Sequence, residues 1–234
     1  MKRVAMFIMV ALICLTTWSR GGSAMPATFN ESVYLPGIEA EIRALSGRSI
    51  IVGPAAGESS ELAAYAAANE FGATVRPKKG KYLAVPLRPE ARDRSPRDFN
   101  LEYIPPKTTG GNPILALVVK TSGAKDRVIP YYVLLKKIEI PERSWLRSTF
   151  DKRETVDKAV RIASDAMGRL LSGQGKATDV LNAIGLSLVA SVKSRIASNI
   201  QPPNAPLTLA LKRRKSSTLV DEGRLISSIQ YEVK

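Results

Sequence analysis

The sequence predicts an α+β fold with an antiparallel sheet, three or four packed helices and a C-terminal strand. Residues 178–196 place apolar side chains at every fourth position, the spacing of one helix face. Residues 114–119 and 131–135 are rich in β-branched and aromatic side chains, and a Thr-Ser-Gly turn lies between them, which predicts a hairpin. Residues 229–233 alternate apolar and polar side chains, as an edge strand does. Together these elements indicate an α+β protein.

The first part of the chain body predicts a helix, a strand and a second helix. Residues 37–45 carry apolar side chains at helical spacing. Residues 49–52 are mostly apolar and are followed by Gly-Pro, which indicates a short buried strand. Residues 59–70 are rich in alanine and predict a helix suited to close packing against a neighbour. Gly72 ends this helix.

The middle of the chain, about residues 82–140, predicts a β-rich insert within a single domain that covers residues 25–234. Residues 83–87 alternate apolar side chains on one face, before the hairpin described above. Residues 138–140 extend the same sheet until a proline ends it. The charged, proline-containing segment 88–100 predicts a loop between these strands.

Two helices follow the sheet. Asp151 and Glu154 have the spacing of a capping box, which predicts that the first helix begins there. Its apolar face comprises Val156, Val160, Ala163, Met167 and Leu170. A Gly-Gln-Gly break precedes the second helix, whose apolar stripe comprises Val180, Ile184, Leu188, Val192 and Ile196. We interpret this stripe as core, the alternative being an exposed stripe that forms a subunit interface.

The C-terminal part contains a basic cluster and the predicted last strand. The cluster is Lys212, Arg213, Arg214 and Lys215. Asp221 has the position of a cap for a short helical turn that leads into the strand. That strand either completes its own sheet or pairs with a neighbouring subunit by strand addition, and the sequence leaves both alternatives open.

The residue inventory argues against an enzyme and against a bound cofactor or metal. The chain has no histidine, which removes the commonest general base and the commonest metal ligand. Its single cysteine, Cys14, excludes an intrachain disulfide, a cysteine zinc site and a Cys–His nucleophile. No Ser–Lys or carboxylate-only motif is recognisable. We therefore expect no catalytic residues.

The chain is strongly basic, with a formal net charge of +14. A charge of this size favours anionic partners such as nucleic acid, a membrane surface or an acidic protein face. The basic cluster at 212–215 is a candidate for non-specific contact with DNA, because clustered cations bind phosphate without regard to sequence. Residues 76–81 form a second candidate. The alternative for both segments is a solvated loop.

Residues 1–24 have the pattern of a secretory signal peptide. Lys2 and Arg3 precede an apolar run, and a small-x-small site follows at 22–24. The run is shorter than the ~20 residues that a membrane span needs. The competing interpretation is that the natural start is Met25 and that the segment is a spurious extension. In both cases we leave residues 1–24 out of the fold, and we expect no membrane contact for the body.

Four stretches of the body resemble one family. They are residues 217–231, which end in Ser-Ile-Gln-Tyr, the Pro-Asn-Ala-Pro-Leu segment 203–207, the Ala-Asn-Glu-Phe-Gly helix end 68–72, and the Ile-Pro-Glu-Arg-Ser-Trp-Leu-Arg segment 140–147. Taken in their order along the chain, they are similar to stretches of phage virion-morphogenesis and tail-completion proteins, including those of Mu-like prophages. The resemblance covers nearly all of the chain from about residue 38 onward.

The resemblance implies a structural protein of a tailed phage or prophage that completes the tail or joins the head to the tail. Members of the family are similar to subunits that form a ring, often six-fold, with DNA passing through its lumen. Expected partners are further copies of the chain and other neck, connector or tail-tube proteins of a virion that is assembled in the host cytoplasm. The residues that carry the motif or form interfaces are Asn69, Glu70, Phe71, Gly72, Trp145, Leu146, Asp221, Gly223, Arg224, Leu225, Ser228, Ile229 and Tyr231.

The role of Trp145 and Leu146 stays open at this level, and so do two other functions. Trp145 and Leu146 are either an anchor for a partner or part of the packing against the helix that follows Asp151. The runner-up function, a secreted or periplasmic protein with a basic binding surface, depends on residues 1–24. A nucleic-acid-binding module depends on charge alone, because the sequence lacks a helix-turn-helix, zinc or RRM signature.

Overall fold

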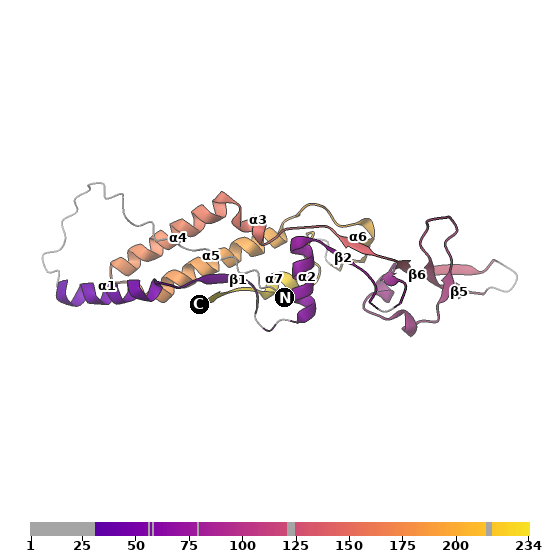
Figure 1. The fold of residues 1–234 in the computed structure, drawn as a ribbon, viewed down its shortest axis with the longest axis horizontal. Coiled ribbons are helices and arrows are strands. Elements are labelled where there is room, and N and C mark those ends of the chain that lie inside the picture. Colours follow the sequence, from indigo (N-terminus) through magenta and orange to yellow (C-terminus); the bar gives the residue numbers. More distant parts are fainter. Residues whose placement is uncertain (1–30, 56, 58, 79, 121–124, 214–216) are drawn as a thin grey trace. The chain divides into compact units, whose positions relative to one another are not determined.

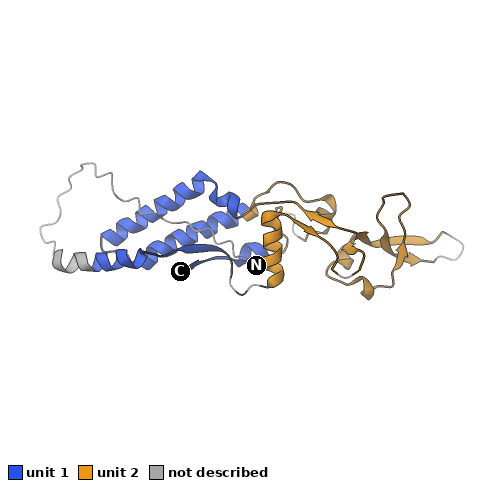
Figure 2. Cartoon of the chain, in the orientation of Figure 1, with its two compact units in different colours: residues 1–59, 146–195, 225–234 blue, residues 60–145, 196–224 orange. Residues whose placement is uncertain are grey.

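A computed structural model of the chain describes residues 31–55, 57, 59–78, 80–120, 125–213 and 217–234. Side chains are described from residue 37 onward. The segment 1–24, Arg214 and Lys215 thus lie outside the described residues. The chain divides into two compact units, coloured separately in Figure 2. Unit 1 comprises residues 1–59, 146–195 and 225–234, and unit 2 comprises residues 60–145 and 196–224. The single body predicted from residue 25 onward therefore divides into two units that are interleaved in sequence.

Unit 1 is built from long helices and a two-stranded sheet (Figure 1). Its elements are α1 (Glu31–Leu45), β1 (Ile50–Pro54), α3 (Arg147–Phe150), α4 (Arg153–Leu171), α5 (Ala177–Ala197), α7 (Arg224–Ser228) and β8 (Ile229–Val233). The last residues of α5 and the first of α7 belong to unit 2 by their contacts.

The core of unit 1 lies where α4 packs against α5. Its buried members are Ala166, Leu170, Val180, Ile184 and Leu188, and side chains from α1 and β1 pack against them. All five residues of the predicted α5 stripe are buried, so the interpretation of that stripe as core is confirmed. The backbone N–H of Ala177 donates to Glu41 Oε2 at 2.6 Å, which satisfies one free donor at the start of α5 from α1.

The start of α4 differs from the prediction. Its N-cap is Lys152, which makes no side-chain capping hydrogen bond, and Asp151 instead ends the short helix α3. The predicted capping box of Asp151 and Glu154 is therefore wrong. The reason is that α3 and α4 follow each other almost directly, so the backbone at Asp151 is already helical (φ −69°, ψ −18°) rather than extended as an N-cap requires.

The C-terminal strand β8 pairs with β1 of the same chain. The pairing is antiparallel and runs from Ile50 opposite Val233 to Pro54 opposite Ile229. Of the two alternatives left open by the sequence, the structure shows the strand in its own sheet. Within the described residues this sheet has two strands only, so each strand keeps one edge without a strand partner.

Unit 2 contains the β-rich part of the chain. Its elements are α2 (Ser60–Phe71), β2 (Ala73–Val75), β3 (Leu83–Pro86), the 3₁₀ turns η1 (Pro89–Ala91) and η2 (Pro96–Asp98), β4 (Glu102–Ile104), β5 (Ile114–Val119), β6 (Arg127–Leu135), β7 (Ile138–Ile140) and α6 (Pro206–Leu211). The predicted insert at about 82–140 lies within this unit and holds β3 to β7.

The strands of unit 2 form two antiparallel sheets. One has four strands in the order β3-β6-β5-β4, and its β5–β6 pair is the predicted hairpin. The other pairs β2 with β7, with Ala73 opposite Ile140 and Val75 opposite Ile138. The expectation that residues 138–140 extend the main sheet is therefore wrong. Strand β2 has only three residues, so its alternation is too short to predict a strand from the sequence. The partner of β7 could therefore not be recognised.

A tyrosine fastens the charged segment 88–100 to the four-stranded sheet. The Tyr132 hydroxyl lies within 3.0 Å of the carbonyl of Ala91 and 2.9 Å of that of Arg94, and its side chain is buried. The Phe99 ring lies 5.1 Å from that of Tyr131, centroid to centroid. The predicted loop therefore packs on its sheet. The fold class is α+β with antiparallel sheets and a C-terminal strand, as predicted.

Candidate functional site

The end of helix α2 forms a hydrogen-bonded joint with residues 143–145. Glu70 is buried, and its carboxylate accepts from the Ser144 hydroxyl at 2.8 Å and from the Trp145 backbone N–H at 2.8 Å. The backbone N–H of Arg143 donates to the carbonyl of Asn69 at 2.7 Å. We call Asn69, Glu70 and residues 143–145 the Glu70 joint. It unites two stretches that the sequence placed in the family motif.

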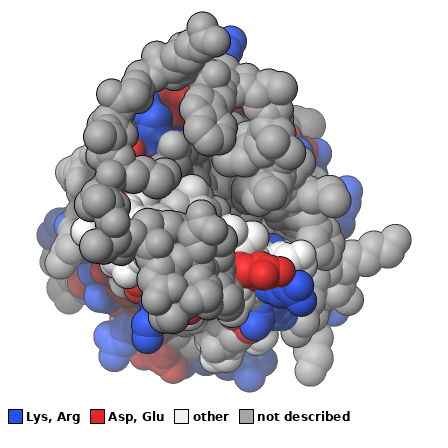
Figure 3. All heavy atoms as spheres, turned by 90° about the vertical axis from the view of Figure 1, so that its left-hand side faces the viewer, with Lys and Arg blue, Asp and Glu red and all other residues white. Residues whose placement is uncertain are grey.

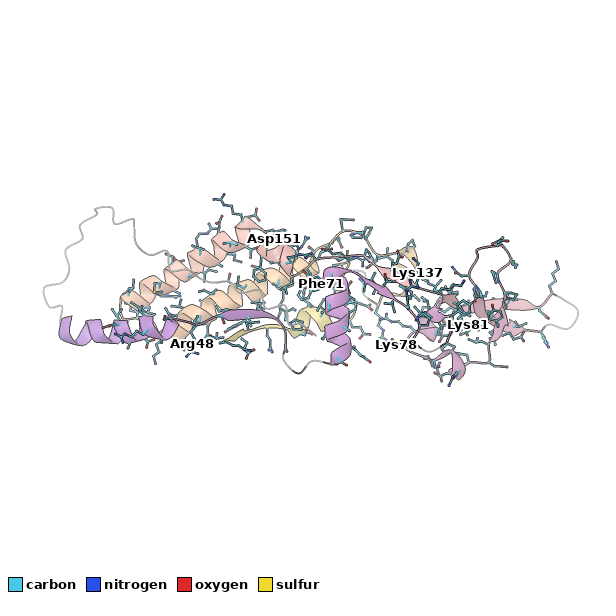
Figure 4. All side chains as sticks on the ribbon, in the orientation of Figure 1. Arg48, Phe71, Lys78, Lys81, Lys137 and Asp151 are labelled. Atoms are coloured by element: carbon cyan, nitrogen blue, oxygen red, sulfur yellow. The ribbon has the colours of Figure 1, made fainter. Side chains whose placement is uncertain are left out.

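Trp145 lies inside unit 2. Its side chain is 2% exposed, and its indole N–H donates to the carbonyl of Ala66 on α2 at 3.2 Å. Of the two alternatives for this residue, packing describes the single chain, and α2 provides one of its partners. Leu146 is half-buried. Phe71, labelled in Figure 4, is 49% exposed at the end of α2.

Gly72 is required by its backbone and by its surroundings. Its φ of +71° lies in the left-handed region, where glycine ends helices without strain. A Cβ added there would lie 3.2 Å from the backbone nitrogen of Glu142 and 3.3 Å from the carbonyl oxygen of Ile140. The glycine thus lets the chain after α2 approach β7 closely.

Arg143 connects the Glu70 joint to the segment that follows α5. Its Nε donates to the carbonyl of Pro202 at 2.8 Å, and its NH2 donates to that of Pro203 at 3.1 Å. Burial lowers the pKa of Arg143. The guanidinium therefore acts as a structural donor, and its charge is turned toward the protein.

Asp221 is the centre of an ion-pair network in unit 2. It pairs with Arg92, and the hydrogen bond between them raises the pKa of Arg92. Asp221 Oδ1 also accepts from the backbone N–H of Arg213 at 2.8 Å. The Arg213 guanidinium lies 2.8 Å from Glu222 and 3.2 Å from Asp93. This Asp221 network fastens the turn at 89–93 to the C-terminal segment.

The described part of the predicted DNA-facing cluster is occupied by these contacts. The Lys212 ammonium donates to the carbonyls of Ser217 and Thr218, and burial lowers its pKa. Arg213 belongs to the Asp221 network. Arg214 and Lys215 lie outside the described residues. The structure therefore turns the two described cations toward their own chain.

The other C-terminal motif residues belong mostly to unit 1. Leu225, Ser228 and Ile229 are buried, and the Ser228 hydroxyl donates to the carbonyl of Leu225 at 2.8 Å. Gly223 has a φ of +86°, which favours glycine, and it precedes Arg224, the first residue of α7. The ring of Tyr231 lies directly over the buried Gly185 of α5.

Sequence reasoning did not identify most of these partners. Nothing in the sequence pairs Glu70 with the backbone of Trp145, or Arg92 with Asp221, because each contact joins segments far apart in the chain. One signal was available for Gly185: a glycine within an otherwise apolar helix indicates close approach of a neighbour.

Helix α4 exposes part of its apolar face. Val156 is 47% exposed, Val160 is 60% exposed and Leu171 is 48% exposed. At about 100° per residue these three side chains lie within a sector of roughly 60° beside the buried face. We call them the α4 stripe. The predicted face was thus right for Leu170, which is buried, while Val156 and Val160 lie on the surface of the single chain.

The described residues hold no assembled metal site and no deep pocket. No group of three or more His, Cys, Asp or Glu side chains gathers among them. The best-formed hollow in this part of the chain is shallow and is lined by residues 72–74 and 139–141. Among the described helices, α5 is long and apolar enough to cross a membrane, and its apolar stripe is the one buried in the core.

No family model, curated protein or solved structure matches this chain.

Proposed function

We propose that the chain is a structural protein of a tailed phage or prophage, which completes the tail or joins head to tail as a ring-forming subunit. The proposal assigns it no catalytic activity. Support comes first from the four resembling stretches of the sequence. Two of these stretches, 68–72 and 140–147, are joined in the structure by the hydrogen bonds of the Glu70 joint.

The single observation that carries the self-association is the α4 stripe. A helix of a small unit gains stability by burying its apolar face, and apolar surface that stays exposed in one chain marks contact sites between chains. Val160 is 60% exposed even though it continues a face whose later members, Met167 and Leu170, turn toward the core. A second copy of the chain is the occupant that a ring requires.

The free edges of β1 and β8 offer a second contact of the same kind. Each strand has backbone donors and acceptors on the side that no other described strand covers. Exposed edges of this kind pair readily with a strand of another chain. Ring closure needs two different contact surfaces on each subunit, and the helix face and the strand edge provide two.

The test is the assembly state of the full chain and of a variant altered on the α4 stripe. We expect concentration-dependent oligomers by sedimentation velocity and rings by negative-stain electron microscopy. Val156→Gln with Val160→Gln should raise the concentration for half-assembly about 30-fold, because burying two half-exposed valines contributes roughly 1 kcal/mol each. Glutamine has a higher helix propensity than valine, so α4 itself should persist.

The matched control is Glu154→Gln with Lys158→Gln. Both residues are exposed on α4, and the pair also adds two glutamines without changing the net charge. The control should assemble like the original chain. A chain that stays monomeric at high concentration and is absent from purified virions would contradict the proposal, and equal effects of both variants would remove the stripe from it.

The first segment decides between this function and the runner-up, a secreted or periplasmic basic binding protein. Mass spectrometry of the N-terminus after cell fractionation separates them. Recovery from the periplasm with residues 1–24 removed supports export. A cytoplasmic product that starts at Met25 or Pro26 supports the virion protein.

A further inference from the structure

Cations from two segments gather where the two sheets of unit 2 follow each other. Residues 76–82 connect β2 to β3, and residues 136–137 connect β6 to β7. Since β2 pairs with β7 and β3 pairs with β6, these two connections run beside each other. We call them the connector strip. Their described residues, which leave out residue 79, include five Lys or Arg and no Asp or Glu.

The register of the two ladders brings the cations together. Val75 pairs with Ile138 at one end of the two connections, and Leu83 pairs with Leu135 at the other end. The cations of both connections therefore lie between the same two ladders. Figure 4 labels Lys78, Lys81 and Lys137 in this part of unit 2.

Glu139 on β7 is a carboxylate beside the strip, and it neutralises only part of this charge. Lys137 lies 2.6 Å from Glu139, and this hydrogen bond lowers the pKa of Glu139. The charge of Arg76 lowers that pKa further, which agrees with the pairing of β2 with β7. One carboxylate thus faces two cations here, and the strip keeps a positive surface.

The other described cations of the strip are exposed and have no partner among the described residues. Lys78, Lys81 and Lys136 are all exposed and make no ion pair or side-chain hydrogen bond within the described part of the chain. Lys212 and Arg213 differ, because their charges already face carbonyls and carboxylates. A second charged molecule therefore meets unpaired cations at the strip and paired ones at 212–213.

The charge of the two units is unequal in the same sense. Unit 2 holds twenty Lys and Arg against eleven Asp and Glu, whereas unit 1 holds fifteen against ten, including the three cations of residues 1–24. On the end-on face in Figure 3, the described side chains show both signs side by side. Most of the excess positive charge of the body thus belongs to unit 2, where the strip lies.

We propose that the connector strip binds the phosphate backbone of nucleic acid without regard to sequence. Clustered, unpaired cations on an exposed surface release counterions from a polyphosphate, and this release drives binding. Lysine is suited to such contacts because its ammonium is a flexible point charge. Contacts to phosphate carry no sequence information, so sequence preference is not part of the proposal. It stands independently of the ring-forming role.

The test uses the full chain and a fluorescein-labelled DNA duplex of about 20 base pairs, followed by fluorescence anisotropy over a range of salt concentrations. The variant is Lys78→Gln, Lys81→Gln and Lys136→Gln, the three unpaired cations of the strip. If the three cations contact phosphates, the slope of log K against log salt should fall by about 3, and affinity at low salt should drop at least about tenfold. Thermal melting checks that the variant stays folded.

The matched control is Lys152→Gln, Lys158→Gln and Lys176→Gln. These lysines are exposed in unit 1, and their loss changes the net charge by the same amount. The control should keep the original slope to within about 1. Equal losses in both variants would overturn the proposal, since the net charge alone would then explain binding. It would also be overturned if the strip variant lost binding to phosphatidylserine vesicles and kept its affinity for DNA.

Discussion

Gly185 shows how one missing methyl group sets the position of the C-terminal strand. The glycine is buried within α5, and the ring of Tyr231 lies on it. The Tyr231 hydroxyl is 3.0 Å from Asn182 Oδ1, one turn earlier on the same helix. The hydrogen bond holds one end of the ring and the strand holds the other, so the ring stays over the glycine.

We therefore expect Gly185→Ala to destabilise the protein. The added Cβ would lie 2.4 Å from Tyr231 Cδ2 and 2.6 Å from Cγ. Overpacking of this kind costs about 1–3 kcal/mol. Alanine gains roughly 1 kcal/mol over glycine in a helix, so the net effect should be a loss of up to about 2 kcal/mol in the free energy of unfolding. Thermal unfolding followed by circular dichroism measures the difference.

Gly168→Ala is the matched control for this substitution. Gly168 also lies within a helix, α4, and a Cβ there would meet nothing within 4 Å. This variant should melt at or above the temperature of the original chain, because only the helix propensity changes. If both variants melted alike, the close packing of Tyr231 on α5 would be disproved.

At the scale of elements, the Glu70 joint holds a helix to a segment seventy-odd positions away. We expect Glu70→Gln to lower the free energy of unfolding by about 1–3 kcal/mol, because hydrogen bonds to a charged carboxylate are replaced by weaker bonds to a neutral amide. Glutamine keeps one acceptor oxygen but points an amide N–H₂ at the other donor. The Ser144 hydroxyl can rotate to accept it, whereas the Trp145 backbone N–H cannot.

Urea denaturation measures this loss, with Glu61→Gln as the control. Glu61 lies in the first turn of the same helix and is exposed. Its neutralisation should cost only about 0.5 kcal/mol through the helix dipole. A loss at Glu70 no larger than that at Glu61 would show that the joint does not stabilise unit 2.

The elements differ in how well the sequence predicts them. Helix α5 was predictable because its stripe repeats at one period along the whole helix, so the local pattern and the core agree. The capping box at Asp151 failed because α3, a helix of four residues, is too short to leave a periodic signal. The same shortness hid β2 and, with it, the partner of β7.

The candidate sites were predictable only in part, for a related reason. The sequence pointed to Glu70 and Trp145 through a resemblance, but not to the hydrogen bond between them, because composition carries no information on long-range contacts. It singled out the cations at 212–215 and at 76–81 by their clustering. Which of them face solvent depends on partners such as Asp221 and Glu222, which only the folded chain brings close.

At the scale of the whole molecule, the proposed contacts with itself and with nucleic acid should respond oppositely to salt. Contact through the α4 stripe buries apolar side chains, and sulfate strengthens such burial. Contact through the connector strip releases counterions and weakens as salt rises. We expect added ammonium sulfate to favour the oligomer in sedimentation velocity. The same salt should abolish the increase in fluorescence anisotropy that the protein causes when it binds the labelled duplex. Parallel loss of both would show that one electrostatic surface serves both contacts.

The order of synthesis delays the pairing of β8 with β1. Strand β1 leaves the ribosome as residues 50–54, but its partner follows only as residues 229–233. At about 5–20 residues per second, β1 waits roughly 10–35 s for that partner. The segment 60–145 emerges in the interval and supplies most of unit 2. A nascent chain halted before residue 229 therefore leaves β1 without its strand partner and Gly185 without the ring of Tyr231. Unit 1 can complete its fold only after residues 229–233 have been synthesised.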